Sequence, residues 1–381
     1  MKIKKNYLLS PGPTPVPDSV SLAGAMAIIH HRTPQFQEVM KDCFEGLKIL
    51  FATQQPVLFF AASGTGAMEA AVANLVNAGD EVIVAEGGKF GERWTKIAKV
   101  FGCKPTVVKV EYGRAIQPAQ IEETLKKNPK TKAVFVQLSE TSTGCVFDIE
   151  AMAKVVRKTE ALFVVDGISG LGAEPCYPDP WGIDCLLTGS QKGVMLPPGL
   201  AFISLSERAW KRCEGITSPR FYFDLRAHKK AAEKNDSAFT PPIGLLNQLQ
   251  EALKILKQEG MEGVWKRHTW LGAATRAAVK ALNLELFAER PGNVLTSVKT
   301  PAGVDGEKLV KFMRDNLGVT LAGGQGEMKG NIFRIAHLGY MDRFDITTAI
   351  SALEIALQQQ GFKIQTGKGL TAAQEILRKD P

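Results

Sequence analysis

Residues 188–192 (Thr-Gly-Ser-Gln-Lys) directly follow an apolar run at 183–187 that predicts a buried strand. The last residue of this stretch, Lys192, is then enclosed by glycine and proline turns at 193–199. Most lysines are surface charges, and a lysine walled by apolar residues is badly placed for that role. Burial lowers the pKa of an amine, so Lys192 is a candidate for an amine that condenses with an aldehyde.

A second feature lies 26 positions upstream, where the apolar run at 161–165 ends in Asp166. A continuous apolar run is typical of a strand covered on both faces. Ligands of open α/β sheets bind beyond the carboxyl ends of the strands, which puts Asp166 at the ligand edge. Two interpretations remain open. Asp166 is either a turn-forming residue before Gly167 or a carboxylate that keeps a ring nitrogen protonated.

A third feature joins an apolar run at 57–62 to a helical pattern at 67–76 through Ser63-Gly64-Thr65-Gly66. Free N–H groups and the positive end of the helix dipole at such a junction bind phosphate readily. The spacing is neither GxGxxG nor a P-loop, so a nucleotide is not specifically indicated. An ordinary N-cap by Ser63 or Thr65 is the alternative interpretation.

The strand-like runs define the predicted fold. They lie at 57–61, 81–85, 106–110, 133–138, 162–166, 183–188 and 200–204. Helical patterns lie between most of them, which predicts a mainly parallel sheet covered on both faces. Leucines at 246, 249, 253 and 256 predict a long helix that bridges two domains. A second α/β unit is expected from about residue 264, with strands at 294–299 and 331–335.

Composition is compatible with an ordinary globular protein. The chain has 381 residues, 45% of them hydrophobic, and a formal net charge of +8 that is spread along the sequence. Nucleic acid is therefore a poor candidate partner, and no apolar stretch approaches membrane-spanning length. The six cysteines form no CxxC pair, and residues 10–13 interrupt any signal-peptide pattern. We expect reduced thiols in a cytoplasmic protein.

The order of phosphate cradle, strand-end carboxylate and strand-end lysine resembles the class V aminotransferases of pyridoxal-phosphate fold type I, in the alanine–glyoxylate or serine–pyruvate group. The resemblance runs from residues 9–15 to residues 333–340, and the Ser-Gln-Lys run with its Pro-Pro-Gly-Leu-Ala-Phe sequel is its most specific part. It implies an α/β fold with a seven-stranded, mainly parallel sheet. The expected parts are an arm at the active site (1–20), a large cofactor-binding domain (21–257) and a small C-terminal domain (258–381).

The resemblance also implies roles around the cofactor ring of pyridoxal 5′-phosphate. Lys192 would form the internal aldimine and then move a proton between the substrate and the cofactor. Asp166 would pair with the protonated ring nitrogen. Phe90 would stack on one ring face and Ile168 would press on the other, with plain core packing as the alternative for Ile168.

Further roles concern the phosphate and the subunit partner. The residues expected to hold the phosphate are Ser63, Gly64, Thr65 and Gln191. In relatives another phosphate contact comes from the second subunit, and Thr240 matches it. The resemblance therefore implies a homodimer with shared active sites. Where some relatives carry a tyrosine that touches the partner's cofactor phosphate, this chain has Ser237, which puts that contact in doubt.

The substrate side rests on fewer residues. Arg334 would clamp the α-carboxylate with its planar fork, and Gly12 would let the N-terminal segment approach the substrate closely. Thr141 would hydrogen-bond the phenolic oxygen of the cofactor, with Ser142 as the rival. Arg32 is either a second cation for a dicarboxylic substrate or a surface charge.

No metal site is expected, because the adjacent histidines His30 and His31 cannot face one ligand position and no third ligand is near.

The predicted reaction transfers an amino group from L-alanine or L-serine to glyoxylate or pyruvate. Aspartate and phosphoserine aminotransferases of the same fold are alternatives. Less favoured are a pyridoxal-phosphate lyase or desulfurase, which would need a reactive late cysteine, and a non-catalytic binding subunit. A nicotinamide dehydrogenase would need GxGxxG.

Overall fold

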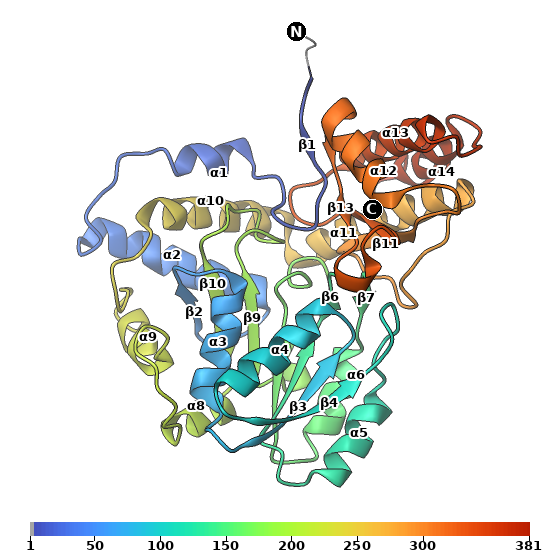
Figure 1. Cartoon of the computed structure of the whole chain (residues 1–381). Coiled ribbons are helices and arrows are strands. Elements are labelled where there is room, and N and C mark those ends of the chain that lie inside the picture. Colours follow the sequence, from blue (N-terminus) through green and yellow to red (C-terminus); the bar gives the residue numbers. More distant parts are fainter. Residues whose placement is uncertain (1–3) are drawn as a thin grey trace.

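A seven-stranded sheet forms the centre of the larger part of the molecule in the computed structural model, which describes residues 4–381 (Figure 1). The strands in spatial order are β2 (Val57–Phe60), β10 (Ala201–Leu205), β9 (Cys185–Gly189), β8 (Leu162–Asp166), β5 (Ala133–Gln137), β3 (Glu81–Glu86) and β4 (Lys104–Lys109). Strand β10 is antiparallel to both of its neighbours, and the pairs from β9 to β4 are parallel. The α/β fold with a mainly parallel seven-stranded sheet is thus confirmed.

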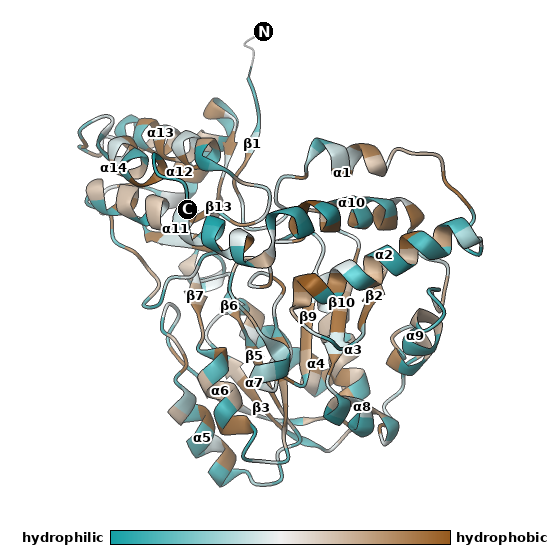
Figure 2. Cartoon of the chain, turned by 180° about the vertical axis from the view of Figure 1, so that it is seen from behind, coloured by the Kyte–Doolittle hydropathy of each residue, from teal (hydrophilic) through white to brown (hydrophobic). Residues whose placement is uncertain are grey.

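The strands from β2 to β3 are buried on both faces of the sheet, which explains their continuous apolar runs, whereas the edge strand β4 is largely exposed (Figure 2). In β8, Phe163 and Val165 join one core cluster, whereas Leu162 and Val164 join the other. The first face is covered by α2 (Pro34–Phe51), α5 (Pro118–Lys127), α6 (Ile149–Val156) and α10 (Ile243–Glu259). The second face is covered by α3 (Gly64–Leu75), α4 (Lys89–Val100), α8 (Glu207–Glu214) and α9 (Leu225–Ala232).

The strand predicted at 162–166 is confirmed as β8, and several other predicted boundaries are wrong by one to three residues. Strand β9 begins at Cys185 and continues to Gly189, so Lys192 follows it by only three residues. Helix α3 begins at Gly64 instead of residue 67. Its first turn is closed by the amide of Gly66, which donates to the Ser63 carbonyl at 2.8 Å. Thr65 therefore belongs to the first turn of the helix and not to a preceding loop.

A second core lies in the C-terminal part of the chain. Its elements are α11 (Met261–Ala281), β11 (Leu295–Lys299), α12 (Gly306–Phe312), β12 (Val319–Thr320), β13 (Ala322–Gly323), β14 (Ile332–Ala336), α13 (Arg343–Gln359) and α14 (Lys368–Leu377). Helix α11 spans both cores, because Val264 packs with the sheet cluster and Leu271 with the second one. We propose the break between α10 and α11 at Gly260, beside the expected boundary at 257/258, as the join between the two domains.

The N-terminal arm reaches the second core before it returns to the sheet. Strand β1 (Tyr7–Leu8) pairs in parallel with β12, and the Leu9 carbonyl accepts from the Ala336 amide at 3.2 Å. The arm then passes along the residues that follow β9. Residues 1–3 of the expected arm lie outside the described residues. Among residues 4–381, no helix is long and apolar enough to cross a membrane.

Candidate active site

Lys192 lies in the turn after β9 and is 8% exposed. Its ammonium donates to the backbone carbonyl of Pro11 in the N-terminal arm. Burial, together with the positive charge of Arg334, lowers the pKa of Lys192 to about 8, although the carboxylate of Asp166 opposes the shift. An amine with this pKa is partly neutral near neutral pH, as nucleophilic chemistry requires.

Gly12 lies directly against this lysine. A Cβ at position 12 would lie 2.2 Å from Lys192 Nζ, and the glycine adopts a φ of +134°. The arm is held here by Thr14, whose amide donates to the Gln191 carbonyl at 3.2 Å and whose hydroxyl donates to the Lys192 carbonyl at 3.1 Å. Only glycine fits this close approach without displacing the lysine.

Asp166 ends β8 at the same edge of the sheet and is 4% exposed. Its Oδ1 accepts from the Ile168 amide at 2.7 Å. Burial raises the pKa of Asp166 to about 7, and the negative charge of Glu140 adds to this rise. The hydrogen bond from Ile168 and the positive charges of Arg93 and Lys192 act in the opposite direction and lower the pKa. A buried carboxylate of this kind gains from a cationic partner.

The predicted phosphate-binding residues gather at the start of α3. Ser63 occupies the N-cap position, but its side chain makes no capping hydrogen bond, so the ordinary N-cap interpretation is wrong for Ser63. A Cβ on Gly189 would lie 3.1 Å from the side-chain oxygen of Gln191 and 3.4 Å from the Gly64 amide nitrogen. The buried oxygen of Gln191 has no hydrogen-bond partner among the described residues. The first amides of α3 and the side-chain NH2 of Gln191 are donors that can hold an anion, whereas the Gln191 oxygen is an acceptor.

Ile168 contacts this cradle directly, whereas Phe90 is linked to it through Arg93. A Cβ on Gly64 would lie 2.6 Å from Ile168 Cδ1, so the isoleucine packs directly on the cradle while it also belongs to the sheet core. Phe90 lies in the first turn of α4 and is half-buried. The guanidinium of Arg93 lies over its ring, 4.9 Å from the centroid.

Thr141 and Ser142 differ in their partners, which bears on the choice left open between them. Ser142 Oγ donates to the Glu140 carboxylate at 2.5 Å and accepts from the Lys89 amide at 3.0 Å. Thr141 Oγ1 donates to Ser169 Oγ at 2.7 Å. The Ser142 hydroxyl is thus engaged in fixing the start of α4, and Thr141 is the better candidate for a ligand contact.

Glu140 is a functional candidate that the sequence interpretation missed. Its side chain is fully buried and accepts from the amides of Phe90 at 3.1 Å, Gly91 at 3.0 Å and Ser142 at 3.2 Å. It therefore caps α4 from a distant part of the chain, because the N-cap residue of α4, Gly88, has no side chain. The only available signal was its place after β5, between Ser139 and Thr141.

Arg334 lies on β14, the central strand of its small sheet, and is 4% exposed. Its guanidinium donates to the carbonyls of Gly323 (3.0 and 2.7 Å) and Thr141 (2.8 Å). Burial lowers the pKa of Arg334 to about 10, and the charge of Glu140 opposes that shift. Within residues 4–381 these partners are neutral carbonyls, which leaves the positive charge available for a carboxylate ligand.

Other candidates are not brought to this centre by the chain itself. Thr240 is exposed just before α10, and no hydrogen bond described for residues 4–381 links it to the site. Arg32 forms an ion pair with Asp236 on the surface, which agrees with the surface interpretation. Ser237 is buried beside that pair. His30 and His31 stack on each other, and the described residues contain no group of three or more ligands placed to hold a metal.

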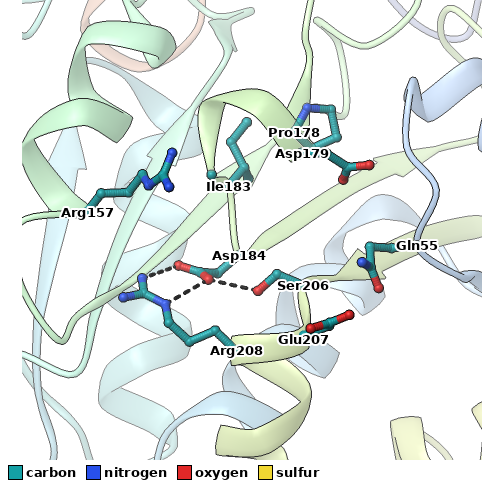
Figure 3. A pocket seen from close by; sticks show the side chains of 10 residues that line it. Gln55, Arg157, Pro178, Asp179, Ile183, Asp184, Ser206, Glu207 and Arg208 are labelled. Atoms are coloured by element: carbon teal, nitrogen blue, oxygen red, sulfur yellow. Dashed lines mark hydrogen bonds and ion pairs between the residues drawn. The ribbon is translucent and has the colours of Figure 1, made fainter.

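A separate pocket of about 510 Å³ lies at the opposite end of β9 from Lys192 (Figure 3). Its buried Asp184 accepts from Arg208 at 2.5 Å and from Ser206 at 2.8 Å. The same carboxylate also accepts from the Phe163 amide at 2.8 Å. Since Asp184 already has these partners, the pocket shows a structural ion pair and not a second reactive centre.

The comparisons with known proteins give one family model and relatives that differ in their names. The family model described as aminotransferase class-V matches residues 6–346. A soluble hydrogenase small subunit of Synechococcus sp. is 42% identical over 98% of both chains. A serine–glyoxylate aminotransferase of Methylorubrum extorquens is 38% identical over 99% of this chain and 97% of the relative. An L-aspartate–glyoxylate aminotransferase of Paracoccus denitrificans is 35% identical over 98% and 97%, respectively.

Solved structures are similar over the whole fold. The ureidoglycine–glyoxylate aminotransferase of Bacillus subtilis superposes with a TM-score of 0.94 at 28% identity, covering 100% of both chains. An alanine–glyoxylate aminotransferase of Nostoc sp. superposes with a TM-score of 0.90 at 28% identity, covering 94% of this chain and 96% of that one.

Proposed function

Because the chain belongs to the class V aminotransferases, we propose that it transfers the amino group of L-serine or L-alanine to glyoxylate or pyruvate, with pyridoxal 5′-phosphate as its cofactor. The observation that carries the proposal is the buried lysine of lowered pKa, Lys192, beside the buried guanidinium of Arg334. An amine nucleophile next to a guanidinium that can bind a carboxylate suits an α-amino acid as the substrate.

The residues present fit the cofactor. The buried side-chain oxygen of Gln191 without a partner marks a polar space beside the first amides of α3. The NH2 group of the same side chain and the uncapped Ser63 hydroxyl are the donors that would face a phosphate there. In this proposal Ser63, Gly64, Thr65 and Gln191 hold the phosphate. Phe90 and Ile168 enclose the ring, Thr141 hydrogen-bonds the phenolic oxygen after its hydroxyl turns from Ser169, and Asp166 holds the proton of the ring nitrogen. When bound, the cofactor supplies an aldehyde that accepts amino groups and a ring that takes up electrons.

The chain's own groups then divide the work. Arg334 binds the substrate carboxylate through two parallel hydrogen bonds and thereby orients the α-carbon. Lys192 is held by the Pro11 carbonyl and lies close to Gly12. It removes the proton from the α-carbon of the amino-acid donor, and in the second half-reaction it returns a proton to the α-carbon of the product amino acid. Burial of both residues excludes water from the reacting atoms.

Two observations support the choice of substrates. Glyoxylate appears in the names of the two aminotransferase relatives and the two solved structures described above, although another similar structure is an aspartate aminotransferase. The Arg32 guanidinium is already paired with Asp236, which favours a donor with a single carboxylate over L-aspartate. Aspartate and phosphoserine remain alternative donors. No described feature favours the activity named for the hydrogenase subunit, a lyase or desulfurase, or a non-catalytic binding role.

We also propose a homodimer in which Thr240 contacts the cofactor phosphate of the partner subunit. Thr240 is exposed, and the nearby surface carries exposed apolar side chains such as Phe221, which is 81% exposed. Sedimentation of the holoenzyme tests the dimer, and a monomer with full activity would contradict it.

A cytoplasmic location is proposed because all six cysteines are buried free thiols.

The substrate proposal is tested by incubating the protein and pyridoxal phosphate with glyoxylate or pyruvate and one donor at a time: L-serine, L-alanine, L-aspartate or phosphoserine. We expect glycine from glyoxylate with L-serine or L-alanine at a kcat/KM at least about tenfold above that with L-aspartate. Preference for L-aspartate or phosphoserine would replace the donor assignment. The absence of amino transfer from every donor would overturn the proposed function.

A further inference from the structure

Arg93 lies one turn after Phe90 on α4 and touches two parts of the proposed cofactor site. Its guanidinium carbon lies 4.9 Å from the centroid of the Phe90 ring. Its Nη1 donates to Thr65 Oγ1 at 3.0 Å. The side chain therefore bridges the first turn of α4, which carries the expected stacking ring, and the first turn of α3, which carries the expected phosphate-binding residues.

The cation of Arg93 has no carboxylate partner within residues 4–381, although an acid directly precedes it in the sequence. Glu92, the adjacent residue, accepts from Lys89 at 2.9 Å and from the Tyr112 hydroxyl. Arg93 is left with a hydroxyl and an aromatic face, both neutral. A half-buried guanidinium in such surroundings keeps an uncompensated positive charge beside the phosphate cradle.

The charge of Arg93 also reaches the reacting groups. It lowers the pKa of the Asp166 carboxyl and lowers the pKa of the Lys192 ammonium. Asp166 is also faced by Glu140 and Lys192, and Lys192 is faced by Arg334, so Arg93 is one of several charges that act there. The backbone of Phe90 is fixed separately, because its amide donates to Glu140.

We propose that Arg93 is a positioning residue for the cofactor, which holds the Phe90 ring against the start of α3 and adds one positive charge behind the phosphate-binding groups. The inference rests on the proposed function. Its geometric part depends on the planar guanidinium, which stacks on a ring while it donates to Thr65. Its electrostatic part depends only on the charge, so the two parts can be separated by substitution.

The experiment compares Arg93→Gln and Arg93→Lys with wild type and with Lys99→Gln. Lys99 is exposed near the other end of α4, so its replacement removes one charge from the same helix without touching the site. Apo forms are titrated with pyridoxal phosphate to obtain Kd, and the visible band of the bound cofactor is titrated with pH. Thermal unfolding of each apo form measures any general loss of structure.

We expect Arg93→Gln to raise the Kd about five- to tenfold and to raise the pKa of the visible band, because a neighbouring positive charge is lost. Arg93→Lys should restore the pKa of the band and only part of the affinity, because an ammonium lacks the planar face. Lys99→Gln should stay within about twofold of wild type in Kd, since exposed charges at that distance are largely screened.

Two results would overturn the inference while the proposed function stands. One is a wild type that binds pyridoxal phosphate while Arg93→Gln matches Lys99→Gln in both the Kd and the pKa of the band. The other is a weaker Kd in Arg93→Gln with an unchanged pKa of the band and an equally large loss of apo-protein thermal stability, which would make Arg93 merely structural. A wild type that binds no pyridoxal phosphate would overturn the proposed function and the inference together.

Discussion

The guanidinium of Arg334 donates to the backbone carbonyl of Thr141 at 2.8 Å, and this hydrogen bond joins the two cores at the proposed active site. Arg334 lies on β14 of the C-terminal core, whereas Thr141 follows β5 of the large sheet. The residue before Thr141, Glu140, holds the start of α4 through backbone amides. The proposed carboxylate clamp and the proposed ring-stacking residue are thus positioned by the same short segment.

Replacing Arg334 with lysine should raise the KM for the amino donor about 30- to 100-fold, with a smaller effect on the affinity for pyridoxal phosphate. The reason is that lysine keeps the charge but loses the fork that binds a carboxylate with two parallel bonds. Steady-state kinetics of Arg334→Lys measures the effect. The matched control is Arg314→Lys in a surface ion pair with Asp315, which should be near wild type. An unchanged donor KM in Arg334→Lys would make Arg334 structural.

Replacing Asp166 with asparagine should lower kcat at least about 100-fold in the holoenzyme. A neutral amide cannot stabilise the ring proton on which the electron-withdrawing power of the cofactor depends. The amide oxygen of asparagine can still accept from the Ile168 amide, so the local fold should persist. Stopped-flow kinetics of the half-reaction with L-serine or L-alanine is the measurement. A kcat within twofold of wild type would rule out the assigned role.

The apo protein should show the cost of burying Asp166 as a pH dependence of stability. The folded-state pKa is raised from 3.8 to about 7, so the native state binds the proton more tightly than the unfolded chain. Stability from this group is therefore fully present below about pH 4 and is lost as the pH rises towards 7. The free energy of unfolding of Asp166→Asn should therefore rise relative to that of wild type as the pH increases through this range, by up to about 4 kcal/mol. Urea unfolding of both apo proteins at pH 4.5 and 8 measures this gain, and a constant difference would contradict it.

Replacing Gly12 with alanine should reduce activity at least about tenfold, because the new Cβ would occupy the space of Lys192 Nζ and displace the lysine from its productive position. Gly303→Ala is the matched control, since Gly303 also has a positive φ (+82°) but a Cβ there would meet nothing within 4 Å. Both variants should lose some stability through backbone strain. Equal activity in the two variants would show that the close contact between Gly12 and Lys192 is not needed for catalysis.

The fold and the clustering of the candidate site residues were predictable where information is local in the sequence. Continuous apolar runs identified the strands, and the polar residues at their carboxyl ends, Asp166 and Lys192, lie together as the parallel topology requires. The element ends were less accurate. At Ser63 the local pattern allowed both an ordinary N-cap and a free ligand, and the uncapped side chain is visible only in three dimensions.

Residues that act through distant partners could not be found in this way. Glu140 caps a helix whose start lies 50 positions earlier in the chain, and Arg93 bonds to Thr65 on another helix. Neither pairing follows any periodicity of the sequence. The surface role of Arg32 could not be decided from the sequence for the same reason, because its partner Asp236 lies 204 positions away. Such contacts are decided by how the layers pack and not by local pattern.

The most direct test is the visible spectrum of the wild-type protein after addition of pyridoxal phosphate, with Lys192→Ala as the control. We predict a yellow band that L-serine or L-alanine bleaches and glyoxylate restores, because one amino group passes through the cofactor in each direction. Lys192→Ala should bind the cofactor without completing this cycle. A wild type that shows no band, or a Lys192→Ala variant that cycles at the wild-type rate, would contradict the assignment of Lys192 as the reactive amine.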